Sequence, residues 1–331
     1  MADQAATLTR TLSLEVARAA EAAAVAAARL RGRGDERLAD AAAAAAMNRE
    51  LSQLPVSGHI VIGEGQRGEV PLLYIGQETG RGGPEADIAV DPLEGTTLCA
   101  KSLPGALAVL AVAERGGLLR VPDIYMEKIA IGPGYEAGVV GLDFSVAENL
   151  QRLAEAKGVH VSEITACVLD RPRHAKLIDE IRAAGAAVSL IGDGDIAGVI
   201  HTCEPDETGI DIYLGTGGAP EGVLAAAALR CIGGQIQGRL VALNDEHARR
   251  AAVLGLKDLS HKYSTADMAS GDIIFAATGV TSGSLLSGVR FYDGQIETHT
   301  VIMRTPSRTV RWIYAEHMDM EKFEAPNQSP V

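Results

Sequence analysis

Two carboxylates and two hydroxyls follow one short apolar run of this chain. Residues 91–97 read Asp-Pro-Leu-Glu-Gly-Thr-Thr and come directly after the apolar residues 88–90. The proline disfavours continuation of a β-ladder, and the glycine lets the backbone approach a ligand closely. We therefore predict a strand whose tip points Asp91 and Glu94 at one centre, the alternative being an ordinary acidic surface turn. Oxygen ligands of this kind suit Mg²⁺ or Mn²⁺ rather than zinc.

Further carboxylates lie at the ends of other predicted elements. Glu64 lies between two glycines after the strand-like residues 60–62, Asp40 lies in the first turn of a predicted helix, and Glu221 begins a later helix after a glycine-rich run. A solvated turn and a helix cap are the ordinary alternatives for Glu64 and Asp40. The glycine-rich run lacks the Gly-Lys-Ser/Thr ending of a nucleotide P-loop, but bare amides at a helix start can hold a phosphate or a sugar hydroxyl.

A basic segment supplies the opposite charge. Arg171-Pro172-Arg173-His174 follows the strand-like residues 165–169. The planar fork of arginine suits bidentate recognition of phosphate, so we favour anion binding over a merely solvated loop. His174 is expected to cap or pack the following helix rather than to bind metal.

These groups together suggest metal-assisted hydrolysis of a phosphate monoester. Asp193 and Asp195 follow another strand-like run and could accept sugar hydroxyls, with a helix N-cap as the alternative role of Asp195. Metal ions would make hydroxide from bound water, and the hydroxyl of Thr96 could position that water or bind the transferred phosphoryl group. No Cys-His or Ser-His-Asp pairing is legible, so a covalent intermediate is the weaker hypothesis.

The elements that must position these residues fall into two regions. The sequence predicts helices over 12–31 and 37–54, followed by strands over 59–62, 72–75, 87–90, 107–113 and 126–131. From about residue 146, helices alternate with strands over 165–169, 187–191 and 210–214, which indicates a largely parallel sheet. Strands over 288–292, 296–304 and 309–315 follow. We predict an N-terminal α+β domain, 1–140, with most metal ligands, and a C-terminal α/β domain, 141–331, with the sugar-phosphate contacts and Glu221.

Composition excludes several classes of function. The chain has 331 residues and a net charge of −13, which argues against a nucleic-acid binder because such proteins neutralise phosphates. No uncharged run approaches the roughly 20 residues of a membrane span, and no secretory signal is visible at the N-terminus. Four cysteines stand far apart, which fits a reducing cytoplasm without zinc or disulfides. Residues 325–331 are expected to be disordered.

A set of motifs, in order along the chain, resembles the class II fructose-1,6-bisphosphatases, the GlpX-type family. The matching segments are 32–35 (GRGD) with Ala39-Asp40, 61–65 (VIGEG), 87–96 (DIAVDPLEGT), 122–128 (PDIYMEK), 171–174 (RPRH), 193–195 (DGD) and 217–223 (GGAPEGV). The resemblance runs from about residue 12 to about 317. It implies the layered α-β-α-β-α sugar-phosphatase fold of the inositol monophosphatase/fructose bisphosphatase superfamily.

The resemblance also implies a reaction and a role for each matching residue. The reaction is hydrolysis of the 1-phosphate of fructose 1,6-bisphosphate, in gluconeogenesis or Calvin-type carbon metabolism, and some relatives also hydrolyse sedoheptulose 1,7-bisphosphate. Mn²⁺ or Mg²⁺ would be held by Asp40, Glu64, Asp91, Glu94 and Glu221. Thr96 would be the catalytic hydroxyl, with Asp91 and Glu221 beside it in catalysis. Substrate contacts would come from Glu94, Gly95, Thr96, Tyr125, Arg171, Pro172, Arg173, Asp193, Gly194, Asp195 and Gly218. Family members are commonly homo-oligomers.

Two residues depart from the family pattern. Glu36 stands where the family usually has an active-site lysine, and Gly68 stands where it usually has an active-site aspartate. Arg37 or Arg67 would then supply the missing positive charge, and Glu36 or Glu69 the missing carboxylate. Two alternatives to the bisphosphatase stay open: an inositol monophosphatase-like enzyme, and a phosphosugar-binding protein with weak or no catalysis. Glu94, where the former family usually has Asp, and the absence of its Trp-Asp motif disfavour the enzyme alternative.

Overall fold

The chain divides into two compact units, each described here by itself. The computed structural model describes residues 8–324, so the predicted disorder of 325–331 and the first residues of the N-terminus lie outside it. Within the described residues, the first unit comprises 8–115, Ile274–Arg304 and 309–324, and the second comprises Gly116–Ile273 and Thr305–Arg308. The division differs from the predicted ranges 1–140 and 141–331, because strands late in the chain hydrogen-bond into the sheet of the first unit.

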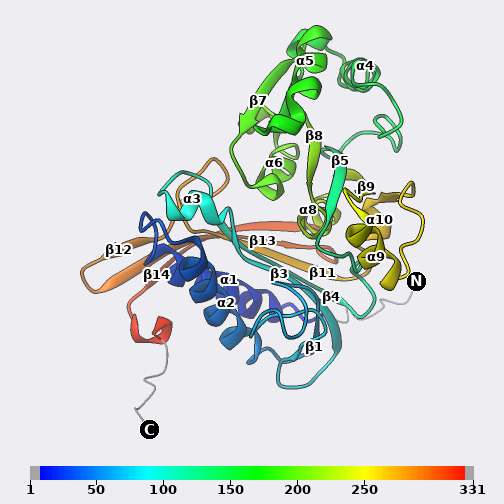
Figure 1. Cartoon of the computed structure of the whole chain (residues 1–331). Helices are drawn as coiled ribbons and strands as arrows, with labels where there is room; N and C mark the ends of the chain where they lie inside the picture. Colours follow the sequence, from blue (N-terminus) through cyan, green and yellow to red (C-terminus); the bar gives the residue numbers. More distant parts are fainter. Residues whose placement is uncertain (1–7, 325–331) are drawn as a thin grey trace. The chain divides into compact units, whose positions relative to one another are not determined.

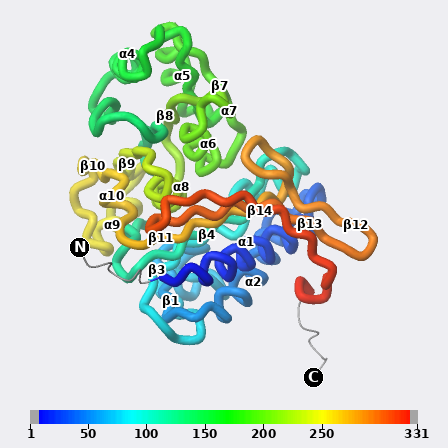
Figure 2. The backbone as a smooth tube through the Cα atoms, turned by 180° about the vertical axis from the view of Figure 1, so that it is seen from behind, coloured from blue at the N-terminus to red at the C-terminus, as the bar shows by residue number. Residues whose placement is uncertain are grey.

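The first unit holds one mixed sheet covered by helices (Figure 1). Its helices are α1 (Leu12–Ala28), α2 (Glu36–Leu51) and the short α3 (Thr96–Ala100), with a 3-10 turn at Glu321–Phe323. Its strands are β1 (Ser57–Ile62), β2 (Glu78–Thr79), β3 (Glu85–Glu94), β4 (Leu107–Glu114), β11 (Ile273–Gly279), β12 (Arg290–Tyr292), β13 (Gln295–Arg304) and β14 (Thr309–His317). In the described residues they lie in the order β12-β13-β11-β4-β3-β1-β2, and β14 pairs with β13 as a long hairpin (Figure 2).

The alanine-rich helices of the first unit pack closely on each other and on the sheet. Helix α1 is buried around most of its circumference, and α1 and α2 pack on each other and on β3 and β4. Small side chains let helices approach a sheet closely, and the buried alanines of α1 permit such an approach here. The apolar side chains of β3 and β4 complete this core.

The second unit holds a six-stranded mixed sheet within the described residues. Its strands are β5 (Tyr125–Ile131), β6 (Thr165–Leu169), β7 (Ala187–Ile191), β8 (Ile212–Gly218), β9 (Gln235–Val241) and β10 (Lys262–Ser264), in the order β10-β9-β5-β8-β6-β7. Its helices are α4 (Val146–Lys157), α5 (Ala175–Ala183), α6 (Asp195–His201), α7 (Pro205–Thr208), α8 (Ala219–Ile232), α9 (Asp245–Val253) and α10 (Thr265–Met268), with 3-10 turns at Val161–Glu163 and Pro172–His174.

The prediction of a largely parallel sheet holds for three strands of the second unit but not for its whole sheet. Within the described residues of this unit, β6 pairs in parallel with β7 and β8, whereas β5 runs antiparallel to both β8 and β9. The alternation of helices and strands described β6 to β8 correctly, but β5 comes earlier in the chain and lies between β8 and β9 in the opposite direction. The mixed α/β fold class itself is confirmed, since each unit combines a mixed sheet with helices.

Strand ends also differ from the prediction. Strand β3 continues past Val90 to Glu94, with a register shift opposite β4 between Asp91 and Glu94, so Pro92 bends the ladder without ending it. The predicted strand 72–75 is wrong. Its backbone forms a loop that makes a single bridge, Tyr74 to Gly65. Strand β8 likewise extends to Gly218, four residues beyond its predicted end. In residues 8–324, no helix combines the length and apolarity needed to cross a bilayer.

Candidate active site

The bend in β3 brings the first two candidate ligands together. Asp91 and Glu94 offer carboxylate oxygens within 4.8 Å of each other, and the two residues flank the register shift of the strand. Asp91 Oδ1 accepts a hydrogen bond of 3.2 Å from the Leu93 amide, which fixes the carboxylate against the bend. Glu94 is only 7% exposed. A buried carboxylate beside a second one is costly unless a cation or a proton neutralises the pair, so this geometry suits a divalent metal.

Thr96 follows this pair as the first residue of α3. Gly95 precedes it with φ 80°, in the left-handed region that favours glycine, and this conformation turns the strand into the helix. The hydroxyl of the next residue, Thr97, donates a hydrogen bond of 2.8 Å to Glu36 Oε1. Glu36 therefore lies beside the end of β3.

Asp40 and Glu64 form a second pair of carboxyl groups in the same unit. The N-cap of α2 is Asp35, which accepts a hydrogen bond of 2.9 Å from the Leu38 amide, so helix capping does not explain Asp40. Burial raises the pKa of Asp40, and a side-chain hydrogen bond with Glu64 partly opposes that rise. Two carboxyl groups within hydrogen-bonding distance share a proton unless a cation takes its place. The geometry therefore fits a second set of metal ligands.

Glu64 is held by a close backbone crossing. The Glu64 amide donates to the carbonyl of Leu73 at 3.0 Å, and a Cβ atom on Gly63 would lie 2.0 Å from that oxygen. Only glycine at position 63 permits this approach. In the following loop, the Glu69 carboxylate accepts from the Gln66 amide at 2.8 Å, and Arg67 lies over the Tyr74 ring.

In the second unit, the arginine segment joins neighbouring strand ends. Arg171 donates to the carbonyl of Gly192 and, at 3.2 Å, to Asp193 Oδ1, so the ends of β6 and β7 are linked. Arg173 donates from Nε to the carbonyl of Thr216 at 2.9 Å, and its guanidinium lies 5.1 Å from the centre of the Tyr125 ring.

These contacts leave the Arg173 terminal nitrogens with no hydrogen-bond partner among residues 8–324. Such nitrogens suit an incoming phosphate.

Asp195 does not cap α6, and its side chain turns inward. The N-cap of α6 is Gly194, in the left-handed conformation with φ 82°, and Asp195 is the first helical residue. Asp195 Oδ2 accepts a hydrogen bond of 2.6 Å from Lys128 Nζ and one of 3.4 Å from Tyr213. We assigned no role to Lys128 from the sequence. The signal was a lysine on the same face of the strand as the apolar Met126 and Ala130.

The glycine-rich run after β8 makes room for two carboxylates. A Cβ atom on Gly218 would lie 1.8 Å from Glu221 Oε2, and one on Gly217 would lie 2.0 Å from Asp195 Oδ2. Both glycines are therefore required by close approach rather than by a phosphate-binding loop. Glu221 occupies the first turn of α8 and folds back over the end of the strand, where Gly218 pairs with Tyr125.

The His174 side chain makes no capping bond to α5, and its ring instead bonds to β6 and β8. Its Nε2 accepts a hydrogen bond of 2.8 Å from the Thr216 amide, so the ring proton lies on Nδ1 and is donated to the Leu169 carbonyl at 2.8 Å. Burial lowers the pKa of His174, which favours this neutral form. The ring thereby joins β6, β8 and the arginine segment.

A cavity of about 290 Å³ lies beside Arg173 within the second unit. Its lining includes Glu127, Phe144, Asn149 and Lys176. The cavity therefore combines polar and apolar surface beside Arg173.

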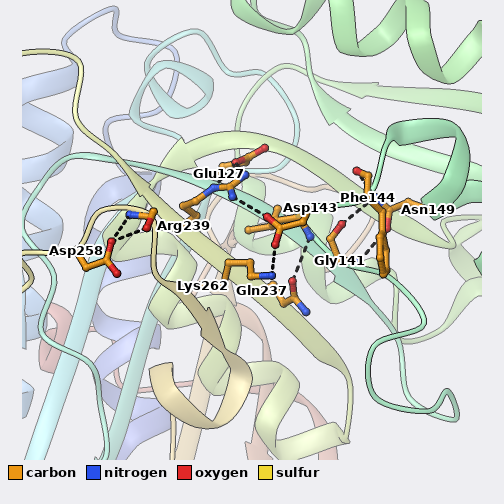
Figure 3. Close-up of polar contacts among 11 residues, drawn as sticks. Glu127, Gly141, Asp143, Phe144, Asn149, Gln237, Arg239, Asp258 and Lys262 are labelled. Carbon is orange, nitrogen blue, oxygen red and sulfur yellow. Dashed lines mark hydrogen bonds and ion pairs between the residues drawn. The ribbon is translucent and has the colours of Figure 1, made fainter.

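The loop that forms this wall is held by a polar network (Figure 3). Arg239 pairs with Glu127 at 2.7 Å and with Asp143 at 2.9 Å, while Lys262 pairs with the other oxygen of Asp143. The hydrogen bond from Lys262 lowers the pKa of Asp143. Asn149 bonds both the amide and the carbonyl of Gly141, so the loop is tied to β9, β10 and α4.

Comparisons with known proteins identify the family of this chain. The family model of bacterial, glpX-encoded fructose-1,6-bisphosphatases matches residues 10–317. The chain belongs to this family. Among its relatives, a D-fructose 1,6-bisphosphatase class 2/sedoheptulose 1,7-bisphosphatase of Synechococcus sp. (strain JA-3-3Ab) is 45% identical, over 93% of this chain and 95% of the relative. A protein of the same description from Synechococcus elongatus (strain ATCC 33912 / PCC 7942 / FACHB-805) is 42% identical, over 94% and 97%.

The structure gives a local setting to Glu36 and Gly68, the two residues expected from the sequence to depart from the family pattern. Glu36 is bonded to Thr97, and Gly68 has φ 92°, in the left-handed region that favours glycine.

Proposed function

We propose that this protein hydrolyses the 1-phosphate of fructose 1,6-bisphosphate in a reaction that requires Mn²⁺ or Mg²⁺. The pairing of Asp91 with Glu94 at the bend of β3, directly before Thr96, carries the proposal. The names of the relatives support the same reaction. Those names also cover sedoheptulose 1,7-bisphosphate, which we propose as a second substrate.

We propose that the divalent cations are held by Asp40, Glu64, Asp91, Glu94 and Glu221. The donor set consists of carboxylate oxygens, which is the chemistry that Mg²⁺ and Mn²⁺ prefer. When bound, these ions would lower the pKa of water and stabilise negative charge on phosphoryl oxygens. The burial of Glu94 and the pairing of Asp40 with Glu64 support this assignment, since both arrangements are costly without a cation.

We propose that the other residues orient the substrate. The free nitrogens of Arg173, together with Arg171, would bind the phosphate that is not hydrolysed, and Tyr125 would pack beside it. Asp193, already bonded to Arg171, would accept a sugar hydroxyl. The hydroxyl of Thr96 would donate a hydrogen bond to the reacting phosphoryl group and hold it in line for attack. Gly95, Pro172, Gly194, Asp195 and Gly218 would contact the substrate or shape its site.

Phosphate release by the purified protein tests this proposal. Fructose 1,6-bisphosphate, sedoheptulose 1,7-bisphosphate and inositol 1-phosphate are offered with Mn²⁺ or Mg²⁺, and Glu94→Gln serves as the site variant. We expect metal-dependent release from a sugar bisphosphate, lost by at least about 100-fold in the variant. Release from inositol 1-phosphate alone would instead identify an inositol monophosphatase-like enzyme. Metal binding without release from any substrate would identify a phosphosugar-binding protein.

We also propose a cytoplasmic homo-oligomer. The resemblance to the family and the scattered cysteines support these two assignments, and light scattering of the eluted protein measures the oligomeric mass.

A further inference from the structure

Helix α3 is too short to be stable without contacts from the rest of the protein. It has five residues, and isolated helices below about 12 residues are marginal in water. It nevertheless begins with Thr96, whose hydroxyl must be fixed if it is to act on a phosphoryl group. The orientation of Thr96 therefore depends on contacts from outside the helix.

The segment from Gly32 to Glu36 contacts α3 at both of its ends. At the C-terminal end, the Gly32 and Gly34 amides donate to the carbonyls of Cys99 and Ala100, at 2.9 and 3.0 Å. Both glycines have positive φ, 72° and 75°, which aims these amides at the helix. The carbonyls at a helix end lack partners inside the helix, so these bonds act as its cap.

At the N-terminal end, the contact is a side chain. The Glu36 carboxylate accepts the hydrogen bond of 2.8 Å from Thr97, the neighbour of Thr96. Asp35 caps α2 and so makes Glu36 the first residue of that helix, directed at α3. Asp40 lies one turn further along α2, at the i, i+4 spacing that places two side chains on one face. One face of α2 therefore contacts both α3 and, through Asp40, Glu64.

We propose that Glu36 is a positioning residue for Thr96, which it orients by holding Thr97 and the first turn of α3. The assignment rests on the proposed phosphatase function. It differs from the idea that Glu36 replaces a carboxylate of the active site, because Glu36 acts here through a threonine hydroxyl. The residue found at the usual lysine position thus holds α3 instead of supplying positive charge.

Steady-state kinetics of four variants test the proposal. Glu36→Ala removes the acceptor, Thr97→Val removes the donor with little change of shape, and Glu36→Gln keeps an acceptor oxygen without the charge. We expect Glu36→Ala and Thr97→Val each to lower kcat about three- to tenfold, the value of one hydrogen bond, with KM little changed. The double variant should be no worse than either single one, and Glu36→Gln should retain most of the turnover.

Three kinetic outcomes would overturn the proposal. They are losses that multiply in the double variant, an effect on KM alone, and a loss in Glu36→Gln as large as in Glu36→Ala. Glu50→Ala is the matched control, since Glu50 lies in the last turn of the same helix and pairs with Arg18 and Arg49. It should leave kcat unchanged.

Hydrogen exchange separates this proposal from the proposed function. The amides of Cys99 and Lys101, which bond within α3, should exchange faster in Glu36→Ala and Thr97→Val than in the unchanged protein or Glu50→Ala. The measurement needs neither substrate nor metal. If the protein hydrolysed no sugar phosphate, the proposed function would fail while exchange still decided the role of Glu36. Unchanged exchange in both variants would overturn that role.

Discussion

Lys128 Nζ and Asp195 Oδ2 lie 2.6 Å apart in the interior of the second unit, where neither side chain is more than 5% exposed. The pair connects β5 to the first residue of α6, next to the loop that carries Asp193. Tyr213 adds a longer hydrogen bond to the same oxygen. A charge pair buried this deeply is stable only while both partners are present.

We expect Lys128→Met to destabilise the protein by about 3–5 kcal/mol, because it leaves the Asp195 carboxylate buried without its cation. Urea unfolding measures the free energy, and a second substitution, Asp195→Asn, should restore part of the loss. Lys262→Met is the matched control. Its ion pair with Asp143 is exposed, and such pairs contribute about 1 kcal/mol or less. Equal losses of unfolding free energy in the two lysine variants would show that burial of the ion pair does not decide its contribution to stability.

Gly218→Ala should abolish most activity while the protein stays folded. The added Cβ atom would lie 1.8 Å from Glu221 Oε2, so the carboxylate must leave its place. Gly192→Ala is the matched control, because a Cβ atom there meets nothing within 4 Å. We expect at least about a 100-fold loss of kcat/KM in the first variant and less than about twofold in the second. Similar activity in both variants would exclude Glu221 from the reaction.

Gly68→Asp introduces the residue that the family resemblance leads us to expect at this position, and it should cost about 1 kcal/mol of stability. Gly68 has φ 92°, which a residue with a Cβ atom adopts only with strain, although the space around it is open. Thermal unfolding measures the cost. Turnover should stay within about twofold of the original value. The loop is held by the hydrogen bond from the Gln66 amide to Glu69 and by the contact of Arg67 with the Tyr74 ring. A large gain in turnover, alone or with Glu36→Lys, would instead mark the site as attenuated.

Glu21 and His317 should give opposite contributions to the dependence of stability on pH. Burial raises the pKa of Glu21 to about 7, while burial lowers the pKa of His317 to about 4. Between pH 4.5 and 7 the unfolded chain loses the Glu21 proton before the folded protein does, so this group lowers stability as pH rises. His317 acts in the reverse direction. Between pH 6.5 and 4 the unfolded chain takes up its proton first, so stability falls as pH falls.

The variant Glu21→Gln separates the two contributions. It keeps an oxygen that can accept from Thr298, the residue that lies between Glu21 and His317. The substitution should change the free energy of unfolding by about 3 kcal/mol more favourably at pH 8 than at pH 4.5. This difference corresponds to the rise of the Glu21 pKa on folding. Urea unfolding at several pH values measures this. A variant whose stability follows that of the original protein at every pH would contradict the raised pKa.

From the sequence, the residues that could bind metal were easier to predict than the ends and directions of the strands. The run from Asp91 to Thr97 was recognisable because proline, glycine and carboxylates have strong local preferences. The continuation of β3 to Glu94 was not, because it depends on pairing with β4. The direction of β5 likewise depends on its neighbours β8 and β9.

Two contacts could not be predicted from local sequence patterns. Lys128 meets Asp195 from 67 positions away, and Glu36 meets Thr97 from 61. Neither residue type indicates such a partner, since lysine and glutamate are usually solvated. Asp195 was therefore assigned to a sugar hydroxyl or to a helix cap, while the structure shows its carboxylate bound to a lysine.

The sheet of the first unit has a consequence for synthesis on the ribosome. Strand β4 is apolar and buried along nearly its whole length, and its neighbour β11 begins only at Ile273. Chains are synthesised at about 5–20 residues per second, so one edge of β4 stays unpaired for on the order of ten seconds before β11 is made. An apolar strand with an unpaired edge is a site of aggregation during that interval. The nascent chain should therefore depend on a chaperone until β11 has been made.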